Sequence, residues 1–304
     1  MTFKPAAAFS PGHITGFFKI CGHVYPHQKG SVGCGIALNS GIRSAVTPIE
    51  GVGDSHLFLN GKTAESRTIL SSVSEIAALA EEKYGTTFHF DIEETGTLPI
   101  GSGFGMSAAG TLSTVFAANA SLKLGLSRDE LIEIAHVAEV SNGSGLGDVA
   151  GASSGGLAVR EIPGGSRFGK FYSIPVPPKT VYCLVLGGLS TKDIISNPAC
   201  IQNINAAGEI ALHQFLKNPT LDSFMAESLS FSKSIGLLSA AAEKIIDSID
   251  SADGMISQAM LGDTVFAIPS EREGADAAIL KSLKKFGTIY ECKIQSGGPF
   301  VCNP

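Results

Sequence analysis

The pattern of hydrophobic and polar positions alternates between strand-like and helix-like segments over residues 1–176. Strict alternation over Phe88, Phe90 and Ile92 predicts a half-buried strand at 86–93. Other strand-like runs lie at 3–9, 35–39, 44–49, 56–59 and 156–162. Helical spacing predicts helices at about 66–84, 106–124 and 128–140, the last of which begins with a capping box formed by Ser127 and Glu130.

The second half of the chain begins after three closely spaced prolines, Pro175, Pro177 and Pro178. Such a stretch before a new apolar run is typical of a domain boundary, so we expect domains at 1–176 and 177–304. Beyond it, strands are expected near 181–186, 255–260, 264–268 and 288–294, with helices between 198 and 249 and at 273–286. This order predicts the α+β class.

Composition and charge narrow the choice of partners. The chain has 304 residues, 44% hydrophobic and 16% charged, which is long enough for about two domains. A net charge of −6 without a basic run argues against nucleic acid and against an anionic membrane. No window reaches 18 uninterrupted apolar residues, and the start does not resemble a signal peptide. The six cysteines form no metal-type spacing, which indicates thiols in a reducing cytoplasm.

The first glycine loop, residues 98–110, runs directly into a predicted helix. Gly101, Gly103 and Gly105 leave the backbone open to a polyanion, and a helix start offers free N–H groups. Met106 and Ser107 follow where a Walker loop has lysine and then serine or threonine, so this is not a Walker loop. Taken alone, the loop is compatible with phosphate binding and equally with an ordinary glycine-rich turn.

A dinucleotide site is the competing interpretation of this loop, because Gly103, Gly105 and Ala108 fit a loose Rossmann fingerprint. That fingerprint follows the first strand of its domain and needs an acidic residue at the end of the second strand. Here about 95 residues precede the loop, and the acids at the right distance, Asp129 and Glu130, begin a helix. The context therefore argues against nicotinamide or flavin binding.

The second glycine loop, residues 142–156, contains one acid, Asp148, among small residues. An aspartate there is compatible with a cap and equally with an acid that orients or deprotonates an alcohol. Glu139 lies at the edge of the apolar face of the preceding helix, where a salt bridge and a magnesium ligand are the alternatives. If phosphates lie on the first loop, Glu139 and the Ser107 hydroxyl are natural ligands of the same ion.

These segments resemble the GHMP small-molecule kinases. The first glycine loop is similar to the central ATP motif of that family, 8–18 to its N-terminal motif, and 147–156 to the segment that bears its catalytic aspartate. Segments 11–18 and 30–36 most resemble the branch that phosphorylates pantoate in coenzyme A biosynthesis. The likeness covers about residues 5–160 and is looser beyond them.

The resemblance implies a two-domain GHMP kinase fold, with an N-terminal domain like ribosomal protein S5 domain 2, a ferredoxin-like C-terminal domain, and ATP between them. It implies that ATP and pantoate give 4-phosphopantoate and ADP. Asp148 becomes the acid at the substrate hydroxyl, and His13, which stands where many relatives have lysine, is the second expected catalytic residue. Ser107 and Glu139 are expected to hold Mg²⁺. The implied ATP contacts are Pro99, Gly101, Ser102, Gly103, Gly105, Met106, Ser107 and Ala108.

Pantoate also needs donors for its carboxylate. Arg160 is the first candidate, because a guanidinium binds carboxylate bidentately, and a surface ion pair is its alternative. His136 lies one turn before Glu139 and is expected to face the same cleft, unless it is simply a helix-face histidine. Ser31 and Thr191 lie in small-residue turns as further donors, or as turn caps.

The C-terminal glycine segment and the oligomeric state are the last features on which the sequence bears. Only 295–300 resembles the third, glycine-rich motif of the family, and in shortened form. We expect that the chain can form a homodimer. The rival functions are a kinase of the same family for homoserine, shikimate or a mevalonate derivative, and a catalytically silent relative that senses a ligand.

Overall fold

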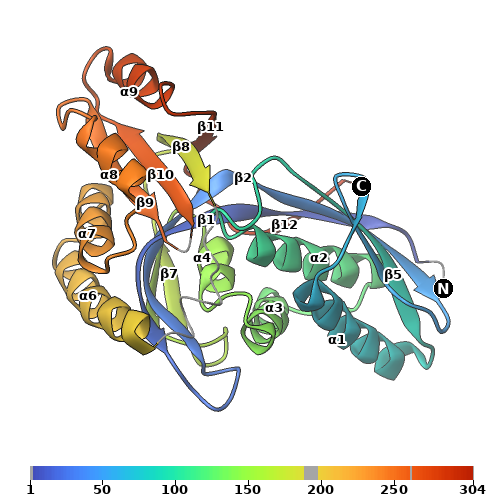
Figure 1. Ribbon diagram of the computed structural model, residues 1–304. Coiled ribbons are helices and arrows are strands. Elements are labelled where there is room, and N and C mark those ends of the chain that lie inside the picture. The colour runs from blue at the N-terminus through green and yellow to red at the C-terminus, as the bar shows by residue number, and fades with distance from the viewer. Residues whose placement is uncertain (1–2, 188–197, 261, 304) are drawn as a thin grey trace.

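Two β-sheets with helices packed on them form the molecule, and the computed structural model describes residues 3–187, 198–260 and 262–303. The first sheet has 8 strands in the order β12-β1-β2-β5-β3-β4, with β6 paired to β2 and β7 paired to β6. The second has 4 strands in the order β11-β8-β10-β9. Figure 1 shows the second sheet and its helices at one end of the long strands β1 and β2.

The strands of the first sheet are β1 (Ala6–Cys21), β2 (Gly30–Glu50), β3 (His56–Leu59), β4 (Lys62–Ala64), β5 (Phe88–Gly96), β6 (Leu157–Ile162), β7 (Lys170–Ile174) and β12 (Phe300–Cys302). Its helices are α1 (Arg67–Tyr84), α2 (Met106–Leu122), α3 (Arg128–Asn142) and α4 (Asp148–Ser154). The second sheet contains β8 (Thr180–Gly187), β9 (Gly254–Ala259), β10 (Asp263–Pro269) and β11 (Ile289–Lys293), accompanied by α6 (Pro198–Lys217), α7 (Leu221–Ser234), α8 (Ala240–Asp247) and α9 (Ala275–Leu283).

The β1–β2 hairpin is much longer than the sequence pattern predicted. The runs expected at 35–39 and 44–49 are parts of the single strand β2, and β1 extends well beyond the expected 3–9. Register shifts at Pro11/Gly12 and Thr15/Phe17 interrupt the pairing and bend the strands. Glycine, serine and proline concealed this hairpin, because they weaken the alternation by which strands are recognised.

α2 is the most enclosed helix of the first domain, since 14 of its 17 residues are buried. It packs against β1 and β2 on one side and against α1 and α3 on the other. Small side chains allow this, because a helix rich in alanine, glycine and serine can approach neighbouring backbones closely. The result is a rigid helix that begins directly at the first glycine loop.

One hydrophobic core connects the two sheets. Phe17 and Phe18 of β1 pack with the aromatic residues of the second half, with ring centroids 5.8 Å apart for Phe17 and Phe215 and 5.9 Å apart for Phe18 and Phe231. A separate core lies between α1, α2, α3 and the first sheet, and a third lies between the second sheet, α8 and α9. The domains therefore share their interior along β1.

Several elements differ from the sequence prediction. The short elements β4, β7, β12 and α4 were not predicted. β12 pairs with β1, so the last strand of the described chain returns to the first sheet. The change from the first sheet to the second falls between Ile174 and Thr180. Over the described ranges, none of the helices has the length and apolar character needed to cross a membrane.

Candidate active site

The first glycine loop is fixed from two sides. The backbone N–H of His13 on β1 donates to the carbonyl of Phe104 at 2.8 Å, and the Thr264 hydroxyl on β10 donates to the carbonyl of Ser102 at 2.6 Å. Gly105 is the N-cap of α2 in the left-handed region, with φ 59°, and none of the described side chains caps this helix end. The first N–H groups of α2 are therefore left for an anion, and the helix dipole favours negative charge there.

A cavity of about 210 Å³ lies between the two glycine loops. It is lined by Ile100, Gly101, Gly103, Phe104, Gly105, Met106, Ser107, Ala108, Glu139, Ser144, Asp148 and Met260. The fold thus brings the expected anion cradle and both expected carboxylates to one place. Pro99 and Ser102 belong to the same loop but do not line the cavity, and Ser102 is buried beneath it.

Glu139 on α3 is the buried carboxylate of this cavity, with 1% of its surface exposed. Its carboxylate packs against Gly145, where a Cβ would lie 2.4 Å from Oε1, so a side chain at this position would require the carboxylate of Glu139 to move. Oε2 is buried and has no hydrogen-bond partner among the described residues. Burial, together with the charge of Asp148, raises the pKa of Glu139 to about 8.

Asp148, the first residue of α4, is held on one oxygen. Oδ1 accepts hydrogen bonds from Nδ1 of His13 at 2.9 Å and from the hydroxyl of Thr15 at 3.2 Å. The side chain keeps 29% exposure, so it faces the cavity. Burial works to raise the pKa of Asp148, but the hydrogen bond and charge of its neighbours outweigh this and lower it. Asp148 is therefore ionised at neutral pH.

Arg160 on β6 lines a second, small cavity of about 20 Å³ together with Asp148. Arg160 is 2% exposed, and its Nε and Nη1 atoms have no hydrogen-bond partner within the described part of the chain. Thr15, Phe18, Ser31, Leu146, Gly147, Asp148 and Met260 line the rest of this cavity. Asp148 and Met260 also line the first cavity, so the two cavities meet at these residues.

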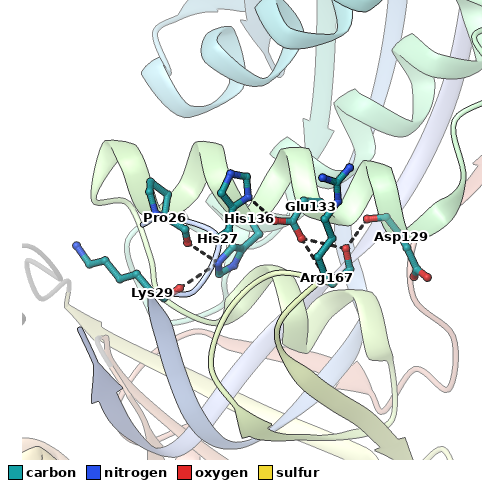
Figure 2. A network of polar contacts seen from close by, with 8 residues as sticks. Pro26, His27, Lys29, Asp129, Glu133, His136 and Arg167 are labelled. Carbon is teal, nitrogen blue, oxygen red and sulfur yellow. Dashed lines mark hydrogen bonds and ion pairs between the residues drawn. The ribbon is translucent and has the colours of Figure 1, made fainter. Parts of the chain in front are cut away.

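His136 does not line either cavity, in contrast to its expected place in the cleft. Its Nε2 lies 3.2 Å from the carbonyl of Pro26 and 3.0 Å from that of Lys29, as Figure 2 shows. Glu133, one turn earlier on α3, binds His27 of the same loop through Nδ1 at 2.6 Å. His136 thus supports the end of the β1–β2 loop, two residues before Ser31.

The second domain reaches the first glycine loop through the turn between β9 and β10. A Cβ on Gly262 would lie 2.2 Å from the carbonyl carbon of Ser102, so the two backbones are in direct contact. The shortened glycine segment 295–300 lies at the C-terminal end of α4. There the N–H of Gly156 donates to the carbonyl of Gln295 at 2.6 Å. The second domain therefore approaches the first glycine loop through Gly262 rather than through 295–300.

Sequence reasoning missed Thr15, Leu146, Gly147, Met260, Gly262 and Thr264 at this site. Thr15 follows His13 by two residues, so strand periodicity would have placed both side chains on one face if β1 had been predicted over its full length. Leu146, Gly147, Met260 and Gly262 are apolar or small residues with no chemical signal of their own, and Thr264 acts on the backbone of the loop, which its position in the sequence does not indicate. Thr191, an expected substrate contact, lies outside the described residues.

Comparison with known proteins agrees with this arrangement. The model of the GHMP kinases N terminal domain matches residues 71–156, and that of the GHMP kinases C terminal domain matches 212–289. The chain therefore belongs to the GHMP kinase family, as its sequence motifs indicated.

Individual relatives match over nearly the full chain. A pantoate kinase of Methanospirillum hungatei is 32% identical, with 99% of this chain and 98% of the relative covered. A pantoate kinase of Methanocaldococcus jannaschii is 34% identical, with coverage of 90% and 97%. A solved structure described as a phosphotransferase related to the CoA biosynthesis pathway has a TM-score of 0.84 at 28% identity, with 99% of both chains covered.

Proposed function

We propose that this chain catalyses the ATP-dependent phosphorylation of pantoate to 4-phosphopantoate, a reaction of coenzyme A biosynthesis. The near full-length likeness to two proteins named pantoate kinase supports the substrate. Membership of the GHMP kinase family supports ATP as the phosphoryl donor. The observation that carries the proposal is that Arg160 is buried while its Nε and Nη1 atoms have no hydrogen-bond partner among the described residues.

Arg160 is a buried cation that feels the charge of Asp148 but leaves two donor atoms without hydrogen bonds among the described residues. A buried charge without a partner is strongly unfavourable, and two of its donor atoms have none among the residues that the structure describes. A substrate carboxylate would pair with them, beside the acid that handles the reacting hydroxyl. Pantoate carries both groups. Homoserine also carries an ammonium group, which the guanidinium would repel, and this favours pantoate over it.

The triphosphate of ATP is assigned to the first glycine loop and the start of α2, where free N–H groups line the cavity. Backbone donors suit this task, since phosphoryl transfer needs positioning and charge stabilisation above all. The proposed contacts are Pro99, Gly101, Ser102, Gly103, Gly105, Met106, Ser107 and Ala108.

Magnesium is proposed to bind at Glu139 and Ser107. The unpartnered Oε2 of Glu139 is a ligand of the kind that Mg²⁺ prefers, and Ser107 lines the same cavity. In the described part of the chain, no cluster of three or more histidine, cysteine or acidic side chains forms a metal site by itself. Glu139 and Ser107 would therefore hold the ion together with phosphate oxygens of the nucleotide, which Mg²⁺ commonly takes as ligands. When bound, the ion supplies charge that offsets the negative charge of the transferring phosphoryl group.

Asp148 is proposed to orient the primary hydroxyl of pantoate and to accept its proton as the hydroxyl attacks the γ-phosphorus. Ser31 is proposed as a further donor to the carboxylate, because it lines the cavity of Arg160. His136 is proposed to act on the substrate through the loop that precedes Ser31. Thr191 stays a predicted contact.

A substrate screen tests the proposal. The full chain is incubated with ATP and Mg²⁺ and with pantoate, homoserine, shikimate or mevalonate, and both ADP release and the phosphorylated product are measured. We expect turnover with pantoate and phosphorylation of its primary hydroxyl. Faster turnover of another alcohol would assign that alcohol as the substrate, and ATP binding without any ADP would identify a silent ligand-sensing protein.

Replacement of Asp148 by asparagine tests the catalytic assignment. Asp148→Asn keeps size and hydrogen bonding but cannot accept the proton, so we expect at least a hundredfold loss of turnover. ATP affinity, measured by calorimetry, should change little because the first glycine loop is untouched. Asp222→Asn on the exposed face of α7 is the matched control. Near-normal turnover of Asp148→Asn would refute the assignment.

The oligomeric state and the cellular location are proposed as well. A homodimer is proposed, and sedimentation equilibrium of the purified chain tests it. The proposed location is the cytoplasm, in keeping with a reaction that uses ATP and a small metabolite, and cell fractionation tests this.

A further inference from the structure

The carboxylate of Asp148, at the start of α4, accepts hydrogen bonds from two side chains of β1. His13 and Thr15 lie on the same strand, their side chains point to the same carboxylate oxygen, and their polar atoms lie 3.4 Å apart. Within the residues that the structure describes, the side-chain hydrogen bonds to this carboxylate end on Oδ1. The second oxygen, Oδ2, is thus left for the reacting group in the cavity.

The surroundings of His13 restrict its protonation. The ring is fully buried, and a Cβ on either Gly35 or Gly151 would lie 2.3 Å from Nε2, so backbone encloses the ring on both sides. Nε2 has no partner in the described chain. A proton on Nε2 would be an unpaired buried donor, which costs more than an unpaired lone pair. The favoured form is neutral, with its proton on Nδ1 facing Asp148.

His13 also contacts the other half of the site through its backbone. Its N–H donates to the carbonyl of Phe104 in the first glycine loop at 2.8 Å, while its side chain holds Asp148 at 2.9 Å. One residue therefore sets the position of the acid relative to the loop that is assigned to the triphosphate. A shift of a reacting group by about 1 Å is enough to slow a reaction about a hundredfold.

We infer that His13 and Thr15 are positioning residues, which as neutral donors hold Oδ1 of Asp148 and leave Oδ2 for the acceptor hydroxyl. The inference rests on the proposed function, since it refines the role of Asp148 in that reaction. The hydroxyl proton passes to Oδ2, the bond from the alcohol oxygen to the γ-phosphorus forms, and the bond from that phosphorus to the bridging oxygen of ADP breaks. His13 keeps its proton throughout and supplies no positive charge.

The charges near Asp148 come from three elements. Arg160 on β6 is a permanent cation near Asp148. Glu139 on α3 is a second carboxyl group, whose pKa is raised to about 8 by burial and by Asp148, and His13 on β1 is the histidine in contact. Burial lowers the pKa of His13, although the hydrogen bond and charge of Asp148 oppose this. Arg160 already provides a cation near Asp148. Because Arg160 supplies the positive charge near Asp148, His13 can hold this carboxylate as a neutral donor.

Kinetics of paired variants provide the first test. Thr15→Val removes one donor and keeps the shape, so kcat should fall roughly tenfold while KM for ATP stays near the wild-type value. Thr15→Ser should restore most of kcat, because the hydroxyl returns. His13→Asn, which keeps a donor near Nδ1 and cannot carry charge, should retain more turnover than His13→Leu. Thr288→Val and His213→Asn, at exposed positions, are the controls.

The acid limb of kcat/KM against pH is the readout that a purely structural role would not move. Loss of a donor to the carboxylate raises the pKa of Asp148, so the limb of Thr15→Val should move to higher pH by about one unit. Wild-type kcat and an unshifted limb in folded Thr15→Val would overturn the role of Thr15. Inactive His13→Asn together with active His13→Lys would overturn the neutral role of His13.

Nitrogen-15 NMR of the imidazole rings in the wild-type chain tests the same inference without any substrate. His13, assigned from the spectrum of His13→Asn, should be neutral with its proton on Nδ1 from about pH 6 to 8. An imidazolium at pH 7, or a proton on Nε2, would overturn the inference. If the wild type phosphorylates another alcohol instead, the proposed substrate fails, and the variants are then measured with that alcohol.

Discussion

At the scale of single residues, Arg160 is a buried cation whose Nε and Nη1 find no hydrogen-bond partner in the ranges that the structure describes. The chain tolerates this because Asp148 and Glu139 lie near enough to interact with its charge. Pre-formed donors in a buried cavity bind a carboxylate without the cost of ordering long side chains at the surface. This makes Arg160 the residue that most directly tests substrate binding.

We expect Arg160→Ala to raise KM for pantoate about a hundredfold, because charge-assisted hydrogen bonds are lost, and to change KM for ATP little. Steady-state kinetics with each substrate varied in turn measure this. Arg67→Ala on the exposed start of α1 serves as control. Equal effects on both Michaelis constants would show that Arg160 supports the fold of the site in general.

Glu94 is a second buried charge, and it lies outside the site. Its carboxylate on β5 accepts hydrogen bonds from Ser44 at 3.3 Å and from Thr114 at 3.1 Å. Burial raises its pKa to about 7, so the folded chain holds this proton over a pH range in which the unfolded chain has lost it. This contribution is therefore present below about pH 4.5 and is lost as the pH rises towards 7.

Glu94→Gln should accordingly remove a pH dependence of stability. At pH 8 we expect the variant to exceed the wild type in free energy of unfolding by up to about 3 kcal/mol, and the difference should be much smaller at pH 5. Urea unfolding at the two pH values measures it. Glu93→Gln, on the exposed side of β5, should show neither effect. A variant less stable than the wild type at pH 8 would contradict the assignment.

At the scale of elements, the turn between β9 and β10 is the part of the second domain that contacts the first glycine loop. Thr264 binds the carbonyl of Ser102, and the N–H of Met260 donates to the carbonyl of Thr15 on β1 at 2.9 Å. These contacts connect the turn to both the loop and the strand of the positioning residues. The turn thus helps to set the shape of the site from the opposite domain.

Gly262→Ala tests this contact. A Cβ at Gly262 would lie 2.2 Å from a backbone atom of Ser102, so the loop or the turn must move. We expect KM for ATP to rise at least tenfold, because the anion cradle depends on backbone positions. Gly22→Ala, where a Cβ meets nothing within 4 Å, is the control. Unchanged ATP kinetics in a folded Gly262→Ala protein would show that the turn does not shape the cradle.

Element prediction succeeded where hydrophobic periodicity was strong. α1, β5, α3 and β10 lie close to their expected bounds, and the capping box of Ser127 and Glu130 is present. It failed along β1 and β2, where small residues interrupt the alternation. It also missed α4, a helix of 7 residues within a glycine-rich segment. These two failures fall on the elements that carry His13, Thr15 and Asp148.

At the scale of the whole molecule, β1 connects two domains through a shared aromatic core. Phe17 is fully buried and packs against Phe215 and Phe224 of the second domain, with ring centroids 5.8 Å and 6.2 Å apart. β12 returns from the second half to pair with β1. Because the interior is continuous, the two domains are expected to unfold together.

Phe17→Ala should therefore destabilise both domains at once. Loss of a buried phenylalanine costs about 3–5 kcal/mol, so we expect a single calorimetric transition at a clearly lower temperature. Val24→Ala, at an 89% exposed position in the β1–β2 loop, is the control. Two separate transitions in the wild type, of which only one moves in Phe17→Ala, would contradict a shared core.

The sequence by itself determined the α+β class, the first glycine loop, and Asp148 and Glu139 as candidate acids. These features are local, because spacing and residue type within a short window are enough to indicate them. The family likeness then added ATP, magnesium and the substrate contacts as expectations.

Only the tertiary structure decided how the site is assembled. It buried Arg160 with two donor atoms unpaired among the described residues, placed His136 against the loop before Ser31, and brought Gly262 against the first glycine loop. It also joined His13 and Thr15 to one oxygen of Asp148, across more than 130 residues of chain. Such contacts depend on strand register and packing between distant segments, and a single sequence carries no local signal of either.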